Sequence, residues 1–164
     1  MEITALYASL LAPLFILLSV RVIGARRSAR VPVGDGGNMV LLRRMRVQAN
    51  FAEYVPFALL LMALAENLGA WPWLMHVLGV ALVAGRVSHA YGVSQHPEVF
   101  RFRISGMAAT LTVIGIAAAI CLFGALQQIF WSLFFKVEPE SSGQRPGKQK
   151  TAKHFCWAVF CKIS

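Results

Sequence analysis

Four long runs of apolar residues constrain this chain more than any other feature of its sequence. They lie within residues 3–23, 39–67, 71–91 and 104–135. About 20 consecutive apolar residues cross a hydrocarbon core of about 30 Å as an α-helix. With 57% hydrophobic and 14% charged residues, the chain of 164 residues lacks the polar surface that a soluble domain needs. The sequence therefore predicts an all-α integral membrane protein with four spans.

The connections between these runs differ in their arginine content. Five arginines flank the Gly- and Pro-rich turn at 31–38, and two lie in the segment 92–103, whereas the short connection at 68–70 has none. Membrane proteins concentrate Arg and Lys in their cytoplasmic loops. We therefore expect an up-and-down bundle of four helices. Its first and third connections should be cytoplasmic, and both termini should lie outside.

Charge also divides the chain into two parts. The net charge is +9, and the same cytoplasmic bias explains much of this excess, so no nucleic-acid partner is expected. Residues 1–135 contain ten Arg and no Lys, whereas residues 136–164 contain five Lys. We interpret 1–135 as the membrane domain and 136–164 as a polar tail that is disordered or specific to this reading frame. The Cys and His residues have no metal-ligand spacing, so no metal site is expected.

The stretch RVQANFAEYVP (46–56) places polar residues at the start of an apolar run. On a helix, Arg46, Asn50 and Glu53 fall within roughly 60° of one another. Such a stripe should face the bundle interior or a partner subunit, and ionisable groups in a membrane are functional candidates. An alternative remains open at this point. Arg46 and Glu53 can simply neutralise each other, or Arg46 can extend to the membrane surface.

A second polar set lies around the end of the third run. Arg86 and His89 are three residues apart, Tyr91 follows them, and Arg101 and Arg103 precede the fourth run. The expected topology brings all of these groups to one membrane face, where they form a cationic pocket that contains one carboxylate. Guanidinium groups bind carboxylates through paired hydrogen bonds, and they stabilise a ligand thiolate. The pattern suits a small anionic ligand that meets an apolar partner dissolved in lipid.

These motifs carry a family resemblance. The pattern Arg-x-x-x-Asn-x-x-Glu-Tyr-x-Pro at 46–56 resembles the second-helix motif of the MAPEG proteins, the membrane-associated proteins of eicosanoid and glutathione metabolism. Three further segments are similar to the family, and above all to its small bacterial inner-membrane members: VGDGG (33–37), GRVSHAYG (85–92) and RISGM (103–107). The resemblance covers about residues 3–135 and leaves out the tail.

The resemblance implies a homotrimer in a bacterial inner membrane, with glutathione as cosubstrate between neighbouring subunits near the cytoplasmic face. It implies transferase or peroxidase-like activity on lipophilic small molecules. Arg103, or alternatively Arg101, would stabilise the thiolate. The glutathione-binding residues would be Arg46, Asn50, Glu53, Arg86, His89, Tyr91 and one arginine of the first helix, either Arg30 or one of Arg26 and Arg27.

One position departs from the family pattern. Several family enzymes carry an aromatic hydroxyl four residues after the position of His89, and this chain has Val93 there. The alternative function is therefore a non-catalytic membrane protein that keeps the fold and binds glutathione or lipid. A small transporter is a weaker alternative, because the spans show neither an inverted repeat nor a pair of broken helices.

Overall fold

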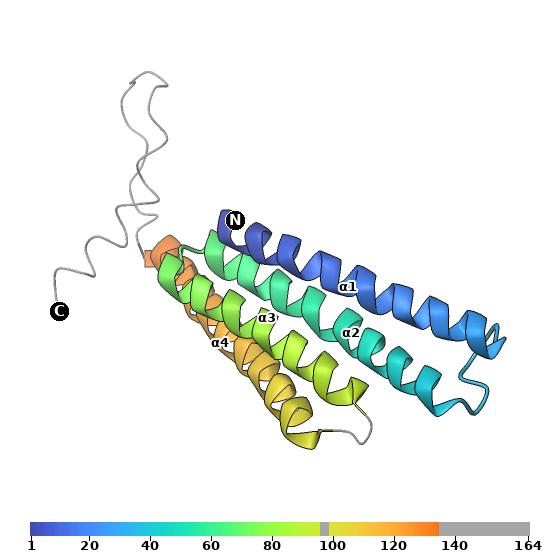
Figure 1. Ribbon diagram of the computed structural model, residues 1–164. Coiled ribbons are helices and arrows are strands. Elements are labelled where there is room, and N and C mark those ends of the chain that lie inside the picture. Colours follow the sequence, from blue (N-terminus) through green and yellow to red (C-terminus); the bar gives the residue numbers. More distant parts are fainter. Residues whose placement is uncertain (96–98, 135–164) are drawn as a thin grey trace.

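Four antiparallel α-helices form the structure. The computed structural model describes residues 1–95 and 99–134, and successive helices run in opposite directions (Figure 1). The helices are α1 (Glu2–Ala29), α2 (Met39–Asn67), α3 (Pro72–Ser94) and α4 (Phe100–Phe134). All four are long and apolar enough to cross a membrane. The prediction of an all-α chain with four membrane spans is confirmed, and the expectations for the 136–164 tail lie outside the described residues.

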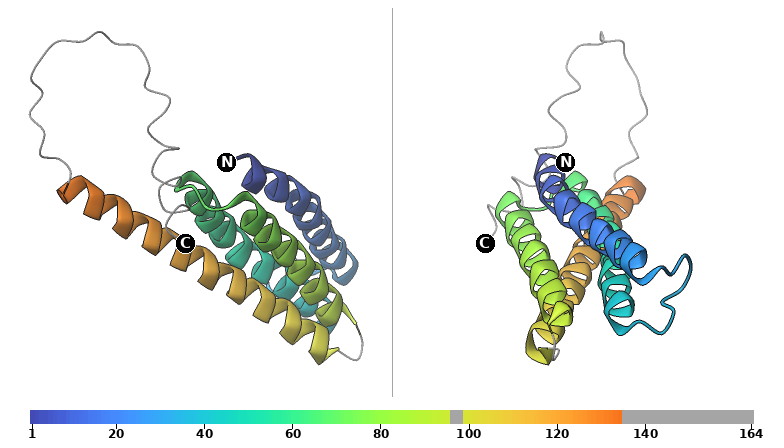
Figure 2. Two further views of the ribbon diagram at one scale, coloured as in Figure 1. Left: turned by 90° about the vertical axis from the view of Figure 1, so that its left-hand side faces the viewer. Right: turned by 45° about the vertical axis from the view of Figure 1, so that its right-hand side comes forward.

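The two middle helices form the centre of the bundle. Helix α2 and helix α3 pack against each other, α1 packs against both on one side, and α4 packs against both on the other. Within the described residues, no Cα atom of α1 lies within 8 Å of a Cα atom of α4. Helix α4 is continuous over 35 residues and begins four residues before the predicted start at 104. It extends past the ends of the other helices (Figure 2).

Short-range signals set several helix ends. The Asn38 side chain caps α2, because its Oδ1 accepts hydrogen bonds from the backbone N–H groups of Val40 and Leu41, each at 3.0 Å. Gly69 follows the last turn of α2 with a φ of 92°, a left-handed conformation that favours glycine, as the sequence predicts for a helix end. Pro72 then begins α3, where a missing N–H costs nothing.

Glu66 caps α1 from another helix. Its carboxylate accepts hydrogen bonds from the backbone N–H groups of Ile3 and Thr4 at 3.0 and 2.9 Å, and from the Thr4 hydroxyl at 2.7 Å. The terminal amine of Met1 also lies 3.0 Å from it. These donors belong to the first turn of α1, which has no side-chain cap of its own. Glu66 therefore ties the start of α1 to the end of α2.

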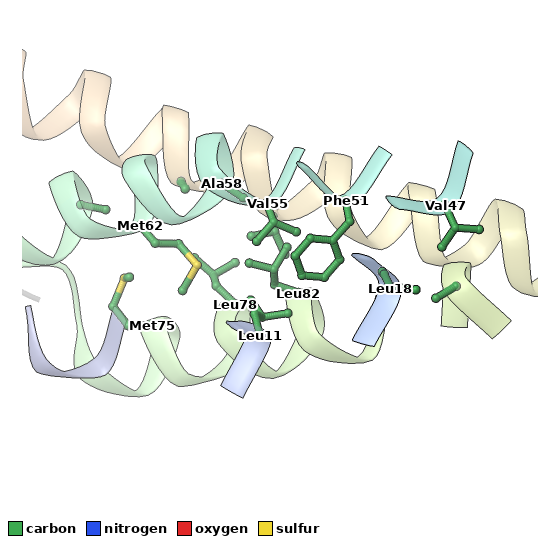
Figure 3. Packing of buried hydrophobic residues seen from close by; sticks show 14 of the residues in the cluster. Leu11, Leu18, Val47, Phe51, Val55, Ala58, Met62, Met75, Leu78 and Leu82 are labelled. Carbon is green, nitrogen blue, oxygen red and sulfur yellow. The ribbon is translucent and has the colours of Figure 1, made fainter. Parts of the chain in front are cut away.

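The core is a narrow apolar cluster between the helices, and most large apolar side chains lie outside it. Leu11, Phe51, Met62 and Leu82 are among the buried residues at its centre (Figure 3). Exposed Leu, Ile and Phe side chains cover the outer faces of α1 and α4. Such a surface is unsuited to water and is typical of helices that face lipid or another subunit.

A polar contact between Tyr7 and His76 joins α1 to α3 outside this cluster. The Tyr7 hydroxyl lies 3.1 Å from His76 Nδ1, and the Tyr7 ring covers Gly79. His76 therefore makes a side-chain contact between helices.

Candidate functional site

The polar stripe of α2 divides between two surfaces of the protomer. Asn50 is partly buried and points toward α3 and α4, whereas Arg46 and Glu53 are exposed. No ion pair joins Arg46 to Glu53 within the described residues, so they do not neutralise each other. Asn50 therefore faces the bundle interior, one of the two expected positions. Arg46 and Glu53 do not face the interior of the protomer, and their contact with a partner subunit stays a prediction. A 60° arc is wide enough to cross the edge of the buried face.

Arg86 is the centre of the buried polar cluster. Its side chain is only 2% exposed, and its Nη1 donates a hydrogen bond to Asn50 Oδ1 at 2.8 Å. Met107 from α4 completes the cluster, because its sulfur lies 3.9 Å from both Arg86 Nη2 and Asn50 Nδ2. One side chain each from α2, α3 and α4 therefore meet at this point.

The environment of Arg86 is unusual for a buried cation. No carboxylate in residues 1–95 and 99–134 forms an ion pair with it, and its buried Nε has no hydrogen-bond partner there. A buried charge is costly unless it is paired and hydrogen-bonded, and a thioether is a weak acceptor. The cluster thus holds positive charge and one unused donor next to Asn50, a combination that attracts an anionic group.

His89 lies one turn beyond Arg86 where α3 and α4 approach closely. Its Nδ1 is 3.3 Å from the backbone carbonyl oxygen of Arg103. A carbonyl oxygen only accepts, so this hydrogen bond requires the proton on Nδ1 and leaves Nε2 as an acceptor when the ring is neutral. Gly85 and Gly106 allow the approach, because a Cβ on Gly106 would lie 2.4 Å from the Gly85 carbonyl oxygen.

The remaining predicted ligands of α3 and α4 are exposed. Arg101 and Arg103 are exposed at the start of α4. Tyr91 is 53% exposed, and its ring packs edge-on against Phe102 at a centroid distance of 5.6 Å. Val93 is buried in the apolar core. The structure therefore brings Arg86, Asn50 and His89 to one region but leaves Tyr91 on an outer surface.

The first-helix arginines have separate surroundings. Arg26 Nη1 donates to the Gly34 carbonyl oxygen at 2.9 Å, and its Nη2 lies 3.5 Å from Met45 sulfur, so Arg26 holds the 31–38 turn against α2. Arg30 is exposed and ends α1 in a left-handed conformation with a φ of 54°. No contact in the described part of the chain joins Arg30 to the Arg86 cluster. Its proposed contact with a ligand stays a prediction.

Met107 is the member of the cluster that sequence reasoning missed. It lies within the RISGM segment, but a methionine in an apolar helix carries no signal that separates it from core residues. Only its position beside two donors identifies it.

Comparisons with known proteins identify the family of this chain. A model of the MAPEG family matches residues 4–123. The chain is also similar to "Inner membrane protein YecN" of Escherichia coli strain K12, with 38% identity over 135 residues that cover 82% of this chain and 98% of the relative. The protein of the same name from E. coli O6:H1 strain CFT073 matches with the same identity and coverage. The chain is therefore a multi-pass membrane protein that belongs to the MAPEG family.

Proposed function

We propose that this protein binds glutathione in a bacterial inner membrane, and that it does so as a homotrimer with the ligand between protomers. The observation that carries the proposal is the position of Glu53. This exposed carboxylate lies fourteen residues from each end of α2. A charged side chain that faces lipid costs up to about 2.5–3.5 kcal/mol at the bilayer centre on insertion scales, and less near the membrane face where this stripe is expected. A neighbouring protomer and a cationic ligand group would remove that cost.

Glutathione matches the charges and the length of the α2 stripe. Its ammonium group suits Glu53, its carboxylates suit Arg46, and the Asn50 amide can donate and accept. Arg46 and Glu53 are separated by seven residues, which is about 10.5 Å along a helix. A tripeptide spans about 10–11 Å when extended. The stripe can therefore engage both ends of one glutathione molecule.

The buried Arg86 cluster supports glutathione binding from the interior of the protomer. Arg86 holds Asn50 through a hydrogen bond of 2.8 Å, which fixes the side chain between the two exposed charges. The unpartnered Nε of Arg86 and the positive charge of its guanidinium favour an anion nearby. A site of this kind is preorganised because its central amide does not need to be ordered on binding.

The reaction that fits these groups is transfer of the glutathione thiolate to a lipophilic electrophile. A guanidinium, from Arg103 or Arg101, would stabilise the thiolate. The sulfur forms a bond to the electrophilic carbon, the leaving group departs with its bonding electrons, and the thiol proton passes to solvent. With a lipid peroxide, the thiolate attacks a peroxide oxygen and an alcohol leaves. The thiol of a second glutathione then attacks the resulting sulfenic acid, which forms a disulfide and releases water.

A second candidate function is binding without catalysis. Val93 is buried and apolar, and Tyr91 is turned toward Phe102, so neither supplies a hydroxyl beside His89. An enzyme of this kind would then depend on arginine alone to stabilise the thiolate. The protein would instead hold glutathione or a lipid without activating it.

Titration of the detergent-solubilised protein with glutathione separates the two functions. Calorimetry measures binding, and ultraviolet absorbance measures the thiolate. We expect Glu53→Gln to weaken binding about tenfold, because it removes one charge-assisted hydrogen bond. Glu2→Gln is the control, because it removes an exposed carboxylate near the terminus and should bind glutathione like the wild type.

The ultraviolet signal decides between the two functions. A thiolate signal that Arg103→Ala or Arg101→Ala abolishes supports the enzymatic function. Binding without thiolate supports the second function, and absence of binding contradicts both.

The proposed homotrimer is tested separately, by measuring the number of chains per particle. Light scattering of the purified protein, corrected for detergent, should give three chains per particle. A monomer would leave Glu53 exposed to the micelle interior and would contradict the proposed site between protomers.

A further inference from the structure

A crevice between three helices lies apart from the Arg86 cluster. It is lined by Leu18 and Arg21 of α1, Arg44 and Val47 of α2, and Ser94 of α3. Because Ser94 is the last residue of α3, the crevice lies toward the end of the bundle that carries the 31–38 turn. None of these residues belongs to the proposed glutathione site.

The crevice changes from apolar to cationic over one helical turn. Leu18 precedes Arg21 by three residues, and Val47 follows Arg44 by three. Because α1 and α2 are antiparallel, both apolar residues lie about 4.5 Å deeper in the bundle than the arginines. Leu18 and Val47 lie at one end of the apolar cluster (Figure 3). A phospholipid changes from acyl chain to phosphate in the same direction.

Within residues 1–95 and 99–134, the two arginines are held in place but most of their N–H donors have no partner. Arg44 Nη1 donates to the Arg21 carbonyl oxygen at 3.1 Å, and Arg21 Nη1 lies 3.4 Å from the Ser94 hydroxyl. Each guanidinium has five N–H donors. No carboxylate among the described residues forms an ion pair with either of them. Their remaining donors can therefore bind a phosphate group in the paired geometry that arginine favours.

Apolar side chains continue from the crevice along the outer face of α1. Leu17 and Val20 are 55% and 57% exposed, and they offer a surface to an acyl chain. The crevice itself has a volume of about 10 Å³, room for about one water molecule. We propose that the phosphodiester of an anionic phospholipid binds across the mouth of this crevice, with Arg21 and Arg44 on the phosphate and α1 along the acyl chain. Zwitterionic lipids carry the same phosphate, but their ammonium group is repelled by two adjacent cations. The site therefore selects lipids with a net negative charge.

Native mass spectrometry of the full chain, released from detergent after addition of phosphatidylglycerol or phosphatidylcholine, tests the proposal. We expect one phosphatidylglycerol retained per chain, and much less phosphatidylcholine. Arg21→Gln should weaken retention about tenfold, because it removes a charge-assisted hydrogen bond, and Arg21→Gln with Arg44→Gln should abolish the preference. Arg21→Lys keeps the positive charge and serves as the control for a folding defect. This variant should keep part of the preference for phosphatidylglycerol.

Arg27→Gln is the matched control. It removes one exposed charge from the last turn of the same helix, about 9 Å beyond Arg21 and on another face. We expect less than a twofold change. An equal loss in Arg27→Gln and Arg21→Gln would mean diffuse attraction and would overturn the proposal. Displacement of the lipid by inorganic phosphate or glutathione at millimolar concentration would overturn it too, because the site would then take a soluble anion.

Discussion

The close approach of α3 and α4 gives a sharp prediction for Gly106→Ala. A Cβ at this position would lie 2.4 Å from the Gly85 carbonyl oxygen and 2.6 Å from the His89 backbone nitrogen. Both are backbone atoms, so the two helices must separate. Overpacking of this kind costs about 1–3 kcal/mol, and the upper part of this range applies because no flexible side chain can move away. Alanine gains about 1 kcal/mol over glycine in a helix. The net loss of stability should be about 1–2 kcal/mol.

Gly115→Ala is the matched control in the same helix. Nothing lies within 4 Å of the Cβ that it would add, so it keeps only the gain from helix propensity. The two variants should therefore differ by about 2–3 kcal/mol in the free energy of unfolding. Helical circular dichroism during denaturation in mixed micelles measures the difference. If Gly106→Ala is as stable as Gly115→Ala, the contact between α3 and α4 does not have the geometry described.

Three further substitutions test other contacts. Glu66→Gln should lower the free energy of unfolding by about 1–3 kcal/mol, because an amide NH2 cannot accept the N–H groups of α1, and chemical denaturation in detergent measures it. Gly79→Ala should destabilise by about 0–2 kcal/mol net, because its Cβ would meet the Tyr7 ring while alanine gains about 1 kcal/mol over glycine in a helix, and Tyr7→Leu in the same chain should recover part of the loss. Arg86→Met should change stability by less than about 2 kcal/mol, because loss of the hydrogen bond to Asn50 is offset by removal of a buried charge. The same variant should weaken glutathione binding in calorimetry, and unchanged binding would count against the role given to Asn50.

The sequence predicted the number, order and approximate limits of the helices because each limit has a local cause. The Asn38 side chain accepts hydrogen bonds from the first free N–H groups of α2. Gly69 adopts the left-handed conformation that follows the end of α2. The predicted end of the first span was too early, at residue 23, because the arginines that follow were assigned to a loop. In the structure α1 continues to Ala29, since an exposed helical turn can carry arginine at its C-terminal end.

The candidate site was less predictable than the fold. Spacing alone placed Asn50, Arg46 and Glu53 on one arc, but it did not show where the buried face ends. That limit depends on how α4 packs on α2, which is a tertiary property. The same packing brings the Met107 sulfur next to the Arg86 guanidinium. No pattern in the sequence predicts this contact.

The division of the polar stripe has a consequence for assembly. The buried side of the site, with Asn50 fixed by Arg86, is complete within one protomer, whereas Arg46 and Glu53 are exposed on its outer surface. If glutathione binds between protomers as proposed, one chain presents only part of the site. A ligand that binds the assembled state more tightly than the separate chains stabilises assembly by mass action. The charges that are unfavourable on an isolated protomer thus favour both the neighbour and the ligand, and each of these should strengthen the binding of the other.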